Sequence, residues 1–234
     1  FRGVFRVRRI LREGRFDVLN THSRRDTMLA GVAARLAGTP LIVRTRHLAV
    51  KPGSLLSYTI VPHRVTTVSE HVRRLLLDRG AAPERVATVY SPIPLPDPVE
   101  HSTLRAELGL PDGAVVVGCV SVMREKKGHR ALIDAMAGLL KRSEVFLVLV
   151  GDGSPTLENL QAYVHTLGLD DKILFTGRRA DIPNVLAGFD VFALATEQEA
   201  SGTVFVEAAA AGLPVIGTDV GGVSEMLRDG ATGL

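Results

Sequence analysis

The chain has 234 residues, 46% hydrophobic and 23% charged, a composition typical of a globular protein with a packed core. The formal net charge is +3, aromatic residues make up 5% and tryptophan is absent. Base-stacking surfaces are therefore scarce, and we expect no nucleic-acid partner. No apolar run approaches the roughly 18 residues that span a bilayer, and a single cysteine excludes an internal disulfide, which favours a cytoplasmic protein.

Residues 1–15 are predicted to form a basic amphipathic helix. Six arginines lie among Phe5, Val7, Ile10 and Leu11 in this segment. One interpretation is a solvated helix face. The alternative is contact with anionic lipid headgroups, which would make the protein peripheral to the inner face of the membrane.

Short apolar runs alternate with helical patterns through the first half of the chain. The predicted strands are Asp17–Asn20, Leu41–Thr45, Arg64–Val68 and Val86–Tyr90, and the predicted helices are Arg25–Leu36 and 70–78, the latter capped by Ser69. Four prolines in Ser91–Pro98 can continue neither a helix nor a strand ladder. We therefore predict two domains, 1–95 and 96–234.

The same alternation restarts in the second half. The predicted strands are Ala114–Val120, Val145–Val150, Ile173–Thr176, Val191–Ala195 and Val215–Gly217, and the predicted helices are Gly128–Lys141, Pro155–Leu167, Ile182–Ala187, Val204–Ala211 and 223–227. Continuous apolar strands are typical of parallel sheets buried on both faces. The pattern predicts an α/β fold of two Rossmann-like domains with a cleft between them and ligands at the carboxyl ends of the strands.

Two carboxylates, Glu199 and Glu207, flank the predicted start of the helix Val204–Ala211. A helix N-terminus presents free N–H groups and a positive dipole end, which suit a phosphate, and Gly202 would allow a ligand close to the backbone. A carboxylate one turn into the helix could accept hydrogen bonds from sugar hydroxyls. The alternative interpretation is that both glutamates are surface charges.

Basic residues follow the strand Ala114–Val120. Arg124 and Lys127 at that strand end could face a pyrophosphate, whereas a solvated loop is the alternative. In the first half, His22 and His47 also follow strands, and Arg44 and Arg46 make the surroundings of His47 electropositive. Neither histidine has a partner at metal-ligand spacing, so we expect no metal site.

Taken together, these motifs resemble those of a known family. Residues 116–234 resemble the donor-binding domain of retaining GT-B-fold glycosyltransferases of family 4, and the earlier half resembles the acceptor domain more loosely. The matching pieces are Lys127-Gly128, Val150-Gly-Asp-Gly153, Phe175-Thr-Gly177, the E-x7-E pair Glu199 and Glu207, Gly212-Leu-Pro-Val215 and Gly221-Gly-Val-Ser-Glu225.

The resemblance implies retaining transfer of a sugar from a nucleoside diphosphate donor to a glycan or lipid-linked acceptor, without metal or cofactor. It implies a role in cell-surface glycan or lipopolysaccharide synthesis. By matching positions it assigns Glu199 and His47 to the reacting centre and His22 to the acceptor side. The donor-binding assignments are Arg124, Lys127, Gly202, Thr203, Val204 and Glu207.

The sequence departs from the family pattern in two places. Ser121-Val122 stands where members often have Gly-Arg, a charge that Arg124 could replace, and Ser91-Pro92 stands where Asn-Gly is common. The chain starts at Phe1 and ends in a predicted turn at Leu234, so we interpret it as a piece truncated at both ends, with an incomplete N-terminal domain. The alternatives are an inactive sugar-nucleotide-binding or partner-binding relative and a GT-B-like sugar-nucleotide epimerase.

Overall fold

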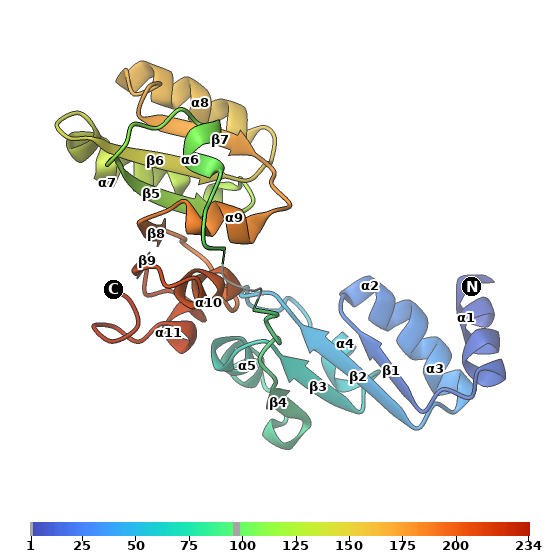
Figure 1. Ribbon diagram of the computed structural model, residues 1–234. Helices are drawn as coiled ribbons and strands as arrows, with labels where there is room; N and C mark the ends of the chain where they lie inside the picture. The colour runs from blue at the N-terminus through green and yellow to red at the C-terminus, as the bar shows by residue number, and fades with distance from the viewer. Residues whose placement is uncertain (1, 96–98) are drawn as a thin grey trace. The chain divides into compact units, whose positions relative to one another are not determined.

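The computed structural model describes residues 2–95 and 99–234, and the chain divides into two compact units, Phe1–Ser91 and Pro92–Leu234 (Figure 1). The division lies inside the proline-rich segment, between Ser91 and Pro92 rather than after Leu95. Residues 96–98 of the predicted connector, and Phe1 of the predicted basic helix, lie outside the described residues.

The first unit is built on a parallel sheet whose strands follow one another in chain order. Its described strands are β1 (Val18–Thr21), β2 (Leu41–Arg46), β3 (Arg64–Thr67) and β4 (Val86–Thr88). Each pairs in parallel with the next, in the register Val18 to Leu41 and Val43 to Arg64. The helix α1 (Arg2–Glu13) buries Leu11 in a cluster with residues of α3 and β2.

The helix predicted over Arg25–Leu36 is instead three successive segments. They are α2 (Arg24–Asp26), the π-helical segment η1 (Thr27–Gly31) and α3 (Val32–Ala37). Ser23 and Asp26 form a capping box at the start. The hydroxyl of Thr27 donates to the carbonyl of Ser23 at 2.6 Å, and a side-chain donor of this kind loosens a helical turn. The unit also contains α4 (Leu56–Thr59), η2 (Pro83–Arg85) and α5 (Glu70–Leu77), which Ser69 caps as predicted.

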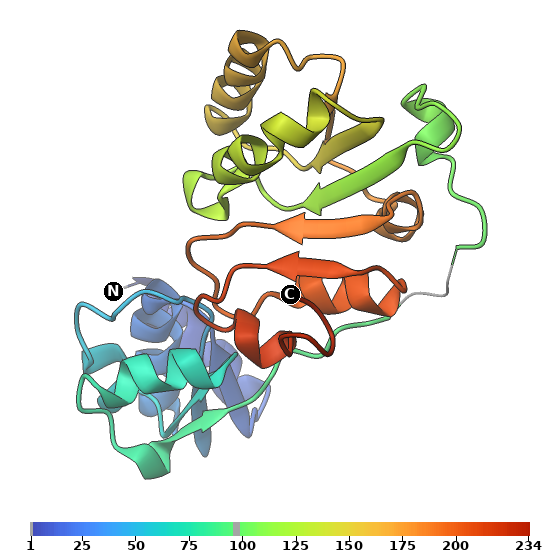
Figure 2. The same ribbon diagram turned by 90° about the vertical axis from the view of Figure 1, so that its left-hand side faces the viewer.

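The second unit contains a five-stranded parallel sheet in the order β7-β6-β5-β8-β9 among the described residues. The strands are β5 (Val115–Val120), β6 (Val145–Val150), β7 (Ile173–Gly177), β8 (Val191–Leu194) and β9 (Val215–Gly217). Figure 2 shows β5, β8 and β9 side by side. Every residue of β6 is buried, as expected for a strand covered on both faces. The prediction of two parallel α/β sheets is therefore confirmed.

The strand order of the second unit reverses between β5 and β8. The helices of the unit are α6 (Leu104–Glu107), η3 (Glu125–Lys127), α7 (His129–Leu140), α8 (Thr156–Leu167), α9 (Ile182–Ala187), α10 (Thr203–Ala210) and α11 (Val223–Met226). Right-handed crossovers place α7 and α8 on one face of the sheet and α9 and α10 on the other. Such a reversal opens a crevice at the carboxyl ends of its two strands, where doubly wound sheets bind ligands.

Aromatic packing holds α10 against the sheet. The rings of Phe192 on β8 and Phe205 on α10 meet edge to face with centroids 5.8 Å apart, and both side chains are fully buried. A pair of this kind contributes about 1 kcal/mol beyond its buried area. The contact fixes where the N-terminus of α10 lies relative to the end of β8. In the described part of the chain, every helix is too short or too polar to span a bilayer.

Candidate functional site

The loop after β5 holds a lysine against the loop after β8, at the point where the strand order reverses. Arg124, exposed at the start of this loop, precedes η3, and the turn ends at Gly128. The Nζ atom of Lys127 donates to Oε2 of Glu199 at 2.5 Å, and the two side chains are 26% and 13% exposed. The structure thus brings together two of the residues that we predict to be functional.

Backbone contacts bind these two loops closely. The carbonyl of Lys126 accepts hydrogen bonds from the amide of Glu197 at 2.9 Å and from the hydroxyl of Thr196 at 3.1 Å. Gly128 has a φ of +67°, and a Cβ atom there would lie 1.7 Å from the carbonyl oxygen of Ala195. Only glycine therefore fits at this crossing.

The N-terminus of α10 lies beside the same carboxylate. Gly202 precedes the helix with a φ of +78°, and among the described residues no side chain caps the first turn. A Cβ atom on Gly202 would lie 3.3 Å from Cγ of Glu199, and the buried hydroxyl of Ser201 has no partner in this part of the structure. Thr203 and Val204 lie in the first turn of the helix, the place to which the family resemblance assigns donor binding.

A third loop, after β9, completes this arrangement. The amide of Gly222 donates to the carbonyl of Glu199 at 3.1 Å, and a Cβ atom on Gly221 would lie 2.0 Å from that same oxygen. The three loops after β5, β8 and β9 therefore converge around Glu199. A lysine, free helix amides and a shielded carboxylate at one point can bind an anion that carries a polar substituent.

Glu207 lies on α10 but lines a different cavity. That cavity has a volume of about 360 Å³ and is also lined by Ile182, Pro183 and Leu186 of α9 and by Val99. Its walls are mostly apolar, so the carboxylate is a single charged group among surfaces that suit a flat ring. Glu207 is connected to the loops around Glu199 through α10, whose N-terminus lies beside Glu199.

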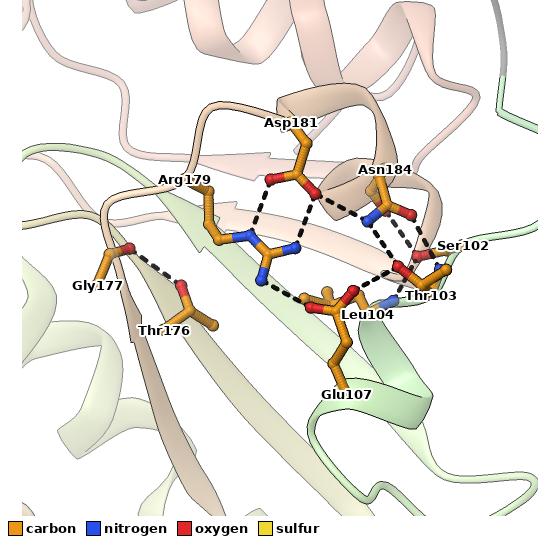
Figure 3. A network of polar contacts seen from close by, with 9 residues as sticks. All are labelled: Ser102, Thr103, Leu104, Glu107, Thr176, Gly177, Arg179, Asp181 and Asn184. Carbon is orange, nitrogen blue, oxygen red and sulfur yellow. Dashed lines mark hydrogen bonds and ion pairs between the residues drawn. The ribbon is translucent and has the colours of Figure 1, made fainter.

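A network of polar contacts anchors the turn that precedes α9 (Figure 3). Arg179 donates two hydrogen bonds to Asp181, at 2.8 and 2.7 Å, and one to Glu107 of α6 at 2.7 Å. The first two lower the pKa of Asp181 well below its usual range. Asn184 bonds both Asp181 and Thr103. The network fixes the N-terminal end of α9, which forms one wall of the cavity at Glu207.

The start of α7 holds a buried neutral histidine behind the lysine loop. Burial is the main cause that lowers the pKa of His129 to about 4, and the positive charge of Lys127 lowers it further. Nε2 of His129 lies 2.8 Å from Oγ of Ser121, at the end of β5. The ring is therefore neutral at physiological pH and adds no positive charge to the loop that carries Lys127.

In the first unit, the two predicted histidines contact each other. Nδ1 of His22 and Nε2 of His47 are 2.9 Å apart, and the rings stack with centroids 5.2 Å apart. Partial burial, and then the neighbouring ring of His22, lower the pKa of His47. The sequence contains a signal for this pair, because the residues follow β1 and β2, which are parallel neighbours. Within residues 2–95 and 99–234, no group of three or more His, Cys, Asp or Glu side chains is arranged to hold a metal ion.

Comparison with known protein families identifies the chain. The sequence profile of the family described as Glycosyl transferases group 1 matches residues 100–234, and that of Glycosyltransferase Family 4 matches residues 1–95. The chain belongs to the group 1 glycosyltransferases. The family resemblance inferred from the motifs is thereby confirmed.

Individual relatives of this group 1 glycosyltransferase agree with the family match. A GDP-mannose-dependent alpha-(1-6)-phosphatidylinositol monomannoside mannosyltransferase of Mycolicibacterium smegmatis is 30% identical over 97% of the chain and 65% of its own length. The lipopolysaccharide core biosynthesis glycosyltransferase LpsE of Rhizobium meliloti is 37% identical over 56% of the chain and 37% of its own length. The chain thus spans less than two thirds of either relative.

A solved structure extends the likeness to the fold. The crystal structure of Anabaena Alr3699/HepE in complex with UDP-glucose is similar with a TM-score of 0.88 and 26% identity, over 99% of this chain and 67% of that one.

Two residues with notable surroundings in the structure of this group 1 glycosyltransferase were not among the site residues predicted from sequence. Ser201 lies within the predicted E-x7-E segment and could have been included. Tyr58, whose ring lies 3.7 Å from the guanidinium group of Arg44, could not, because this contact depends on tertiary packing.

Proposed function

We propose that this group 1 glycosyltransferase moves a sugar from a nucleoside diphosphate donor to an acceptor hydroxyl, with retention at the anomeric carbon. The observation that carries the proposal is the 2.5 Å contact of Lys127 with Glu199 beside the N-terminus of α10, at the strand-order reversal. Positive charge and helix amides at such a crevice suit a diphosphate. The donor named for the similar Anabaena structure, UDP-glucose, supports this class.

The residues take the following roles in this proposal. Lys127, Arg124 and the amides of Thr203 and Val204 stabilise the negative charge that develops on the departing diphosphate, which is the main catalytic contribution. Gly202 allows the phosphate close to the backbone.

The carboxylates and histidines act on the sugars. Glu199 contacts the transferred sugar, and Glu207 accepts hydrogen bonds from the ribose hydroxyls while the base packs on the apolar wall beside α9. His47 lies at the reacting centre and His22 on the acceptor side.

The acceptor is a glycan or a lipid-linked glycan, and the reaction takes place in the cytoplasm as part of cell-surface glycan or lipopolysaccharide synthesis. The names of the relatives, a phosphatidylinositol mannoside mannosyltransferase and a lipopolysaccharide core enzyme, support this assignment.

A donor screen with the full-length protein tests the function. We expect one nucleoside diphosphate sugar to raise the melting temperature of the protein and to be turned over with release of the diphosphate. Excess EDTA should not change the rate of this turnover.

Glu207→Ala should raise the donor Kd about tenfold, which is the scale of a charged hydrogen bond. Glu158→Ala, at an exposed position, should leave the donor Kd unchanged. Binding without turnover would indicate an inactive relative, and a changed donor sugar without transfer would indicate an epimerase. Loss of turnover in EDTA would contradict a metal-independent reaction.

We further propose that α1 attaches the protein to an anionic membrane surface. Phe5 and Ile10 are 61% and 50% exposed on this helix, next to arginines that include Arg6 and Arg9. Each arginine near an anionic surface contributes about 1 kcal/mol of attraction. We expect binding to vesicles that contain phosphatidylglycerol, and at least tenfold weaker binding after Arg6→Gln with Arg9→Gln.

The matched control for the membrane prediction removes two charges from the other unit. Lys141→Gln with Arg142→Gln, both exposed, should leave vesicle binding unchanged. Equal loss in both double variants would indicate a response to net charge alone and would contradict a role for α1.

A further inference from the structure

Two arginines of β2 are buried inside the first unit. Arg44 and Arg46 alternate with Thr45, so both side chains project from the sheet face that also carries Ile42, and each residue is only 4% exposed. Their Nε atoms are buried and have no hydrogen-bond partner among the described residues. Arginine is rarely buried without a paired anion.

No carboxylate within hydrogen-bonding distance balances these charges. Within residues 2–95 and 99–234, neither Arg44 nor Arg46 forms an ion pair. Asp26 attracts Arg44 from a distance, but its carboxylate accepts the amides of His22 and Ser23. Burial, the largest influence, lowers the pKa of Arg44. Two uncompensated buried cations destabilise the folded unit, because each loses its hydration without gaining a paired anion.

The contacts that the arginines do make hold the segment after β2. Arg44 donates to the carbonyl of Ser57 at 3.0 Å and stacks 3.7 Å above the ring of Tyr58. Arg46 donates to the hydroxyl of Tyr58 and to the carbonyl of Val50. If holding this segment were their only role, uncharged donors would serve at lower cost and no N–H group would remain unpaired.

Both arginines line a cavity of about 400 Å³ within the first unit. Besides Arg44 and Arg46, its lining includes Arg24, Lys51 and His47, and none of its described lining residues is acidic. The volume exceeds that of a single phosphate and leaves room for the group that bears it. Buried guanidinium groups and exposed basic side chains around one space favour an oxyanion.

We propose that this cavity binds a phosphate or carboxylate group of the sugar acceptor through Arg44 and Arg46. The inference rests on the proposed function for the identity of the ligand as an acceptor. The bound anion compensates the two buried charges. Because His47 lines the same cavity, the anion anchors the acceptor next to a residue that we assign to the reacting centre.

Nitrogen-15 NMR of arginine Nε–H groups tests the site without donor or activity. The protein carries Lys127→Ala, which removes the predicted diphosphate site of the second unit, and is titrated with methyl phosphate. We expect the Nε–H signals of Arg44 and Arg46, assigned from Arg44→Lys and Arg46→Lys, to shift saturably. Absence of any shift beyond that caused by sodium chloride at equal ionic strength would overturn the proposal.

Variants at the cavity edge keep the test usable if the buried arginines cannot be replaced. Arg24→Gln should raise the Kd for methyl phosphate at least threefold, whereas Arg25→Gln, exposed and outside the lining, should leave it unchanged. Equal effects of the two substitutions would contradict the site. Acetate and dihexanoyl phosphatidic acid are titrated in parallel with methyl phosphate. The probe that binds tightest identifies the anion as a carboxylate, a lipid phosphate or a water-soluble phosphate, respectively.

The assignment to the acceptor has its own readout. Methyl phosphate should inhibit sugar transfer competitively with the acceptor, and inhibition competitive only with the donor would overturn the assignment. Sugar transfer without methyl phosphate binding would refute this inference and leave the proposed function intact. Methyl phosphate binding without turnover of any donor would refute the proposed function and leave the anion site intact.

Discussion

Lys127→Ala is expected to raise the Kd for the donor diphosphate at least tenfold. Nζ of Lys127 lies 2.5 Å from Oε2 of Glu199, and both side chains are mostly shielded from water. A charged hydrogen bond contributes about 1.5–3 kcal/mol, which corresponds to roughly a tenfold to hundredfold change in affinity. The substitution also leaves Glu199 without its cation beside the incoming diphosphate, and this repulsion lowers affinity further.

Titration calorimetry with the nucleoside diphosphate measures the effect. Lys126→Ala is the matched control, because it removes the same charge from the preceding residue. Lys126 is exposed, and its Nζ atom donates a hydrogen bond to Oε1 of Gln198. We expect the control to bind within about twofold of the parent protein, since exposed charges are screened. Unchanged affinity in Lys127→Ala, with an unchanged melting temperature, would refute the assignment of the diphosphate site.

The buried strands were the part of the fold most open to prediction from sequence. Val145–Val150 is predicted and observed with the same bounds, because six successive apolar residues are typical of a strand covered on both faces. The short helices α4 and α6 were not predicted. Each has four residues, and α6 is held by tertiary contacts such as the hydrogen bond from Arg105 to the carbonyl of Gly188 at 3.0 Å.

The candidate site was predictable to the level of strand ends and no further. Lys127 and Glu199 were each expected at a carboxyl end of the sheet, but their direct contact joins residues 72 positions apart. The burial of Arg44 and Arg46 likewise depends on Tyr58, which lies in the unpredicted helix α4. Local patterns encode the elements, whereas these pairs depend on how loops from different elements pack.

Gly128→Ala is expected to destabilise the second unit by about 3 kcal/mol or more and to weaken donor binding as well. The left-handed backbone at Gly128 costs a non-glycine residue about 1–2 kcal/mol. The new Cβ atom would also lie 1.7 Å from the carbonyl oxygen of Ala195, so the two loops must separate. Separation breaks the hydrogen bonds that Lys126 accepts from Glu197 and Thr196, at about 1 kcal/mol each.

Gly168→Ala isolates the backbone part of this cost. Gly168 follows α8 with a φ of +63°, close to that of Gly128, but a Cβ atom there meets nothing within 4 Å. We therefore expect a loss of only about 1–2 kcal/mol in urea unfolding and no change in donor affinity. The difference in the free energy of unfolding between the two variants measures how closely the loop after β5, which carries Lys127, approaches the loop after β8. If both variants lost the same stability and bound donor equally well, the loops would not meet at Gly128, and Lys127 would not be held in place by this crossing.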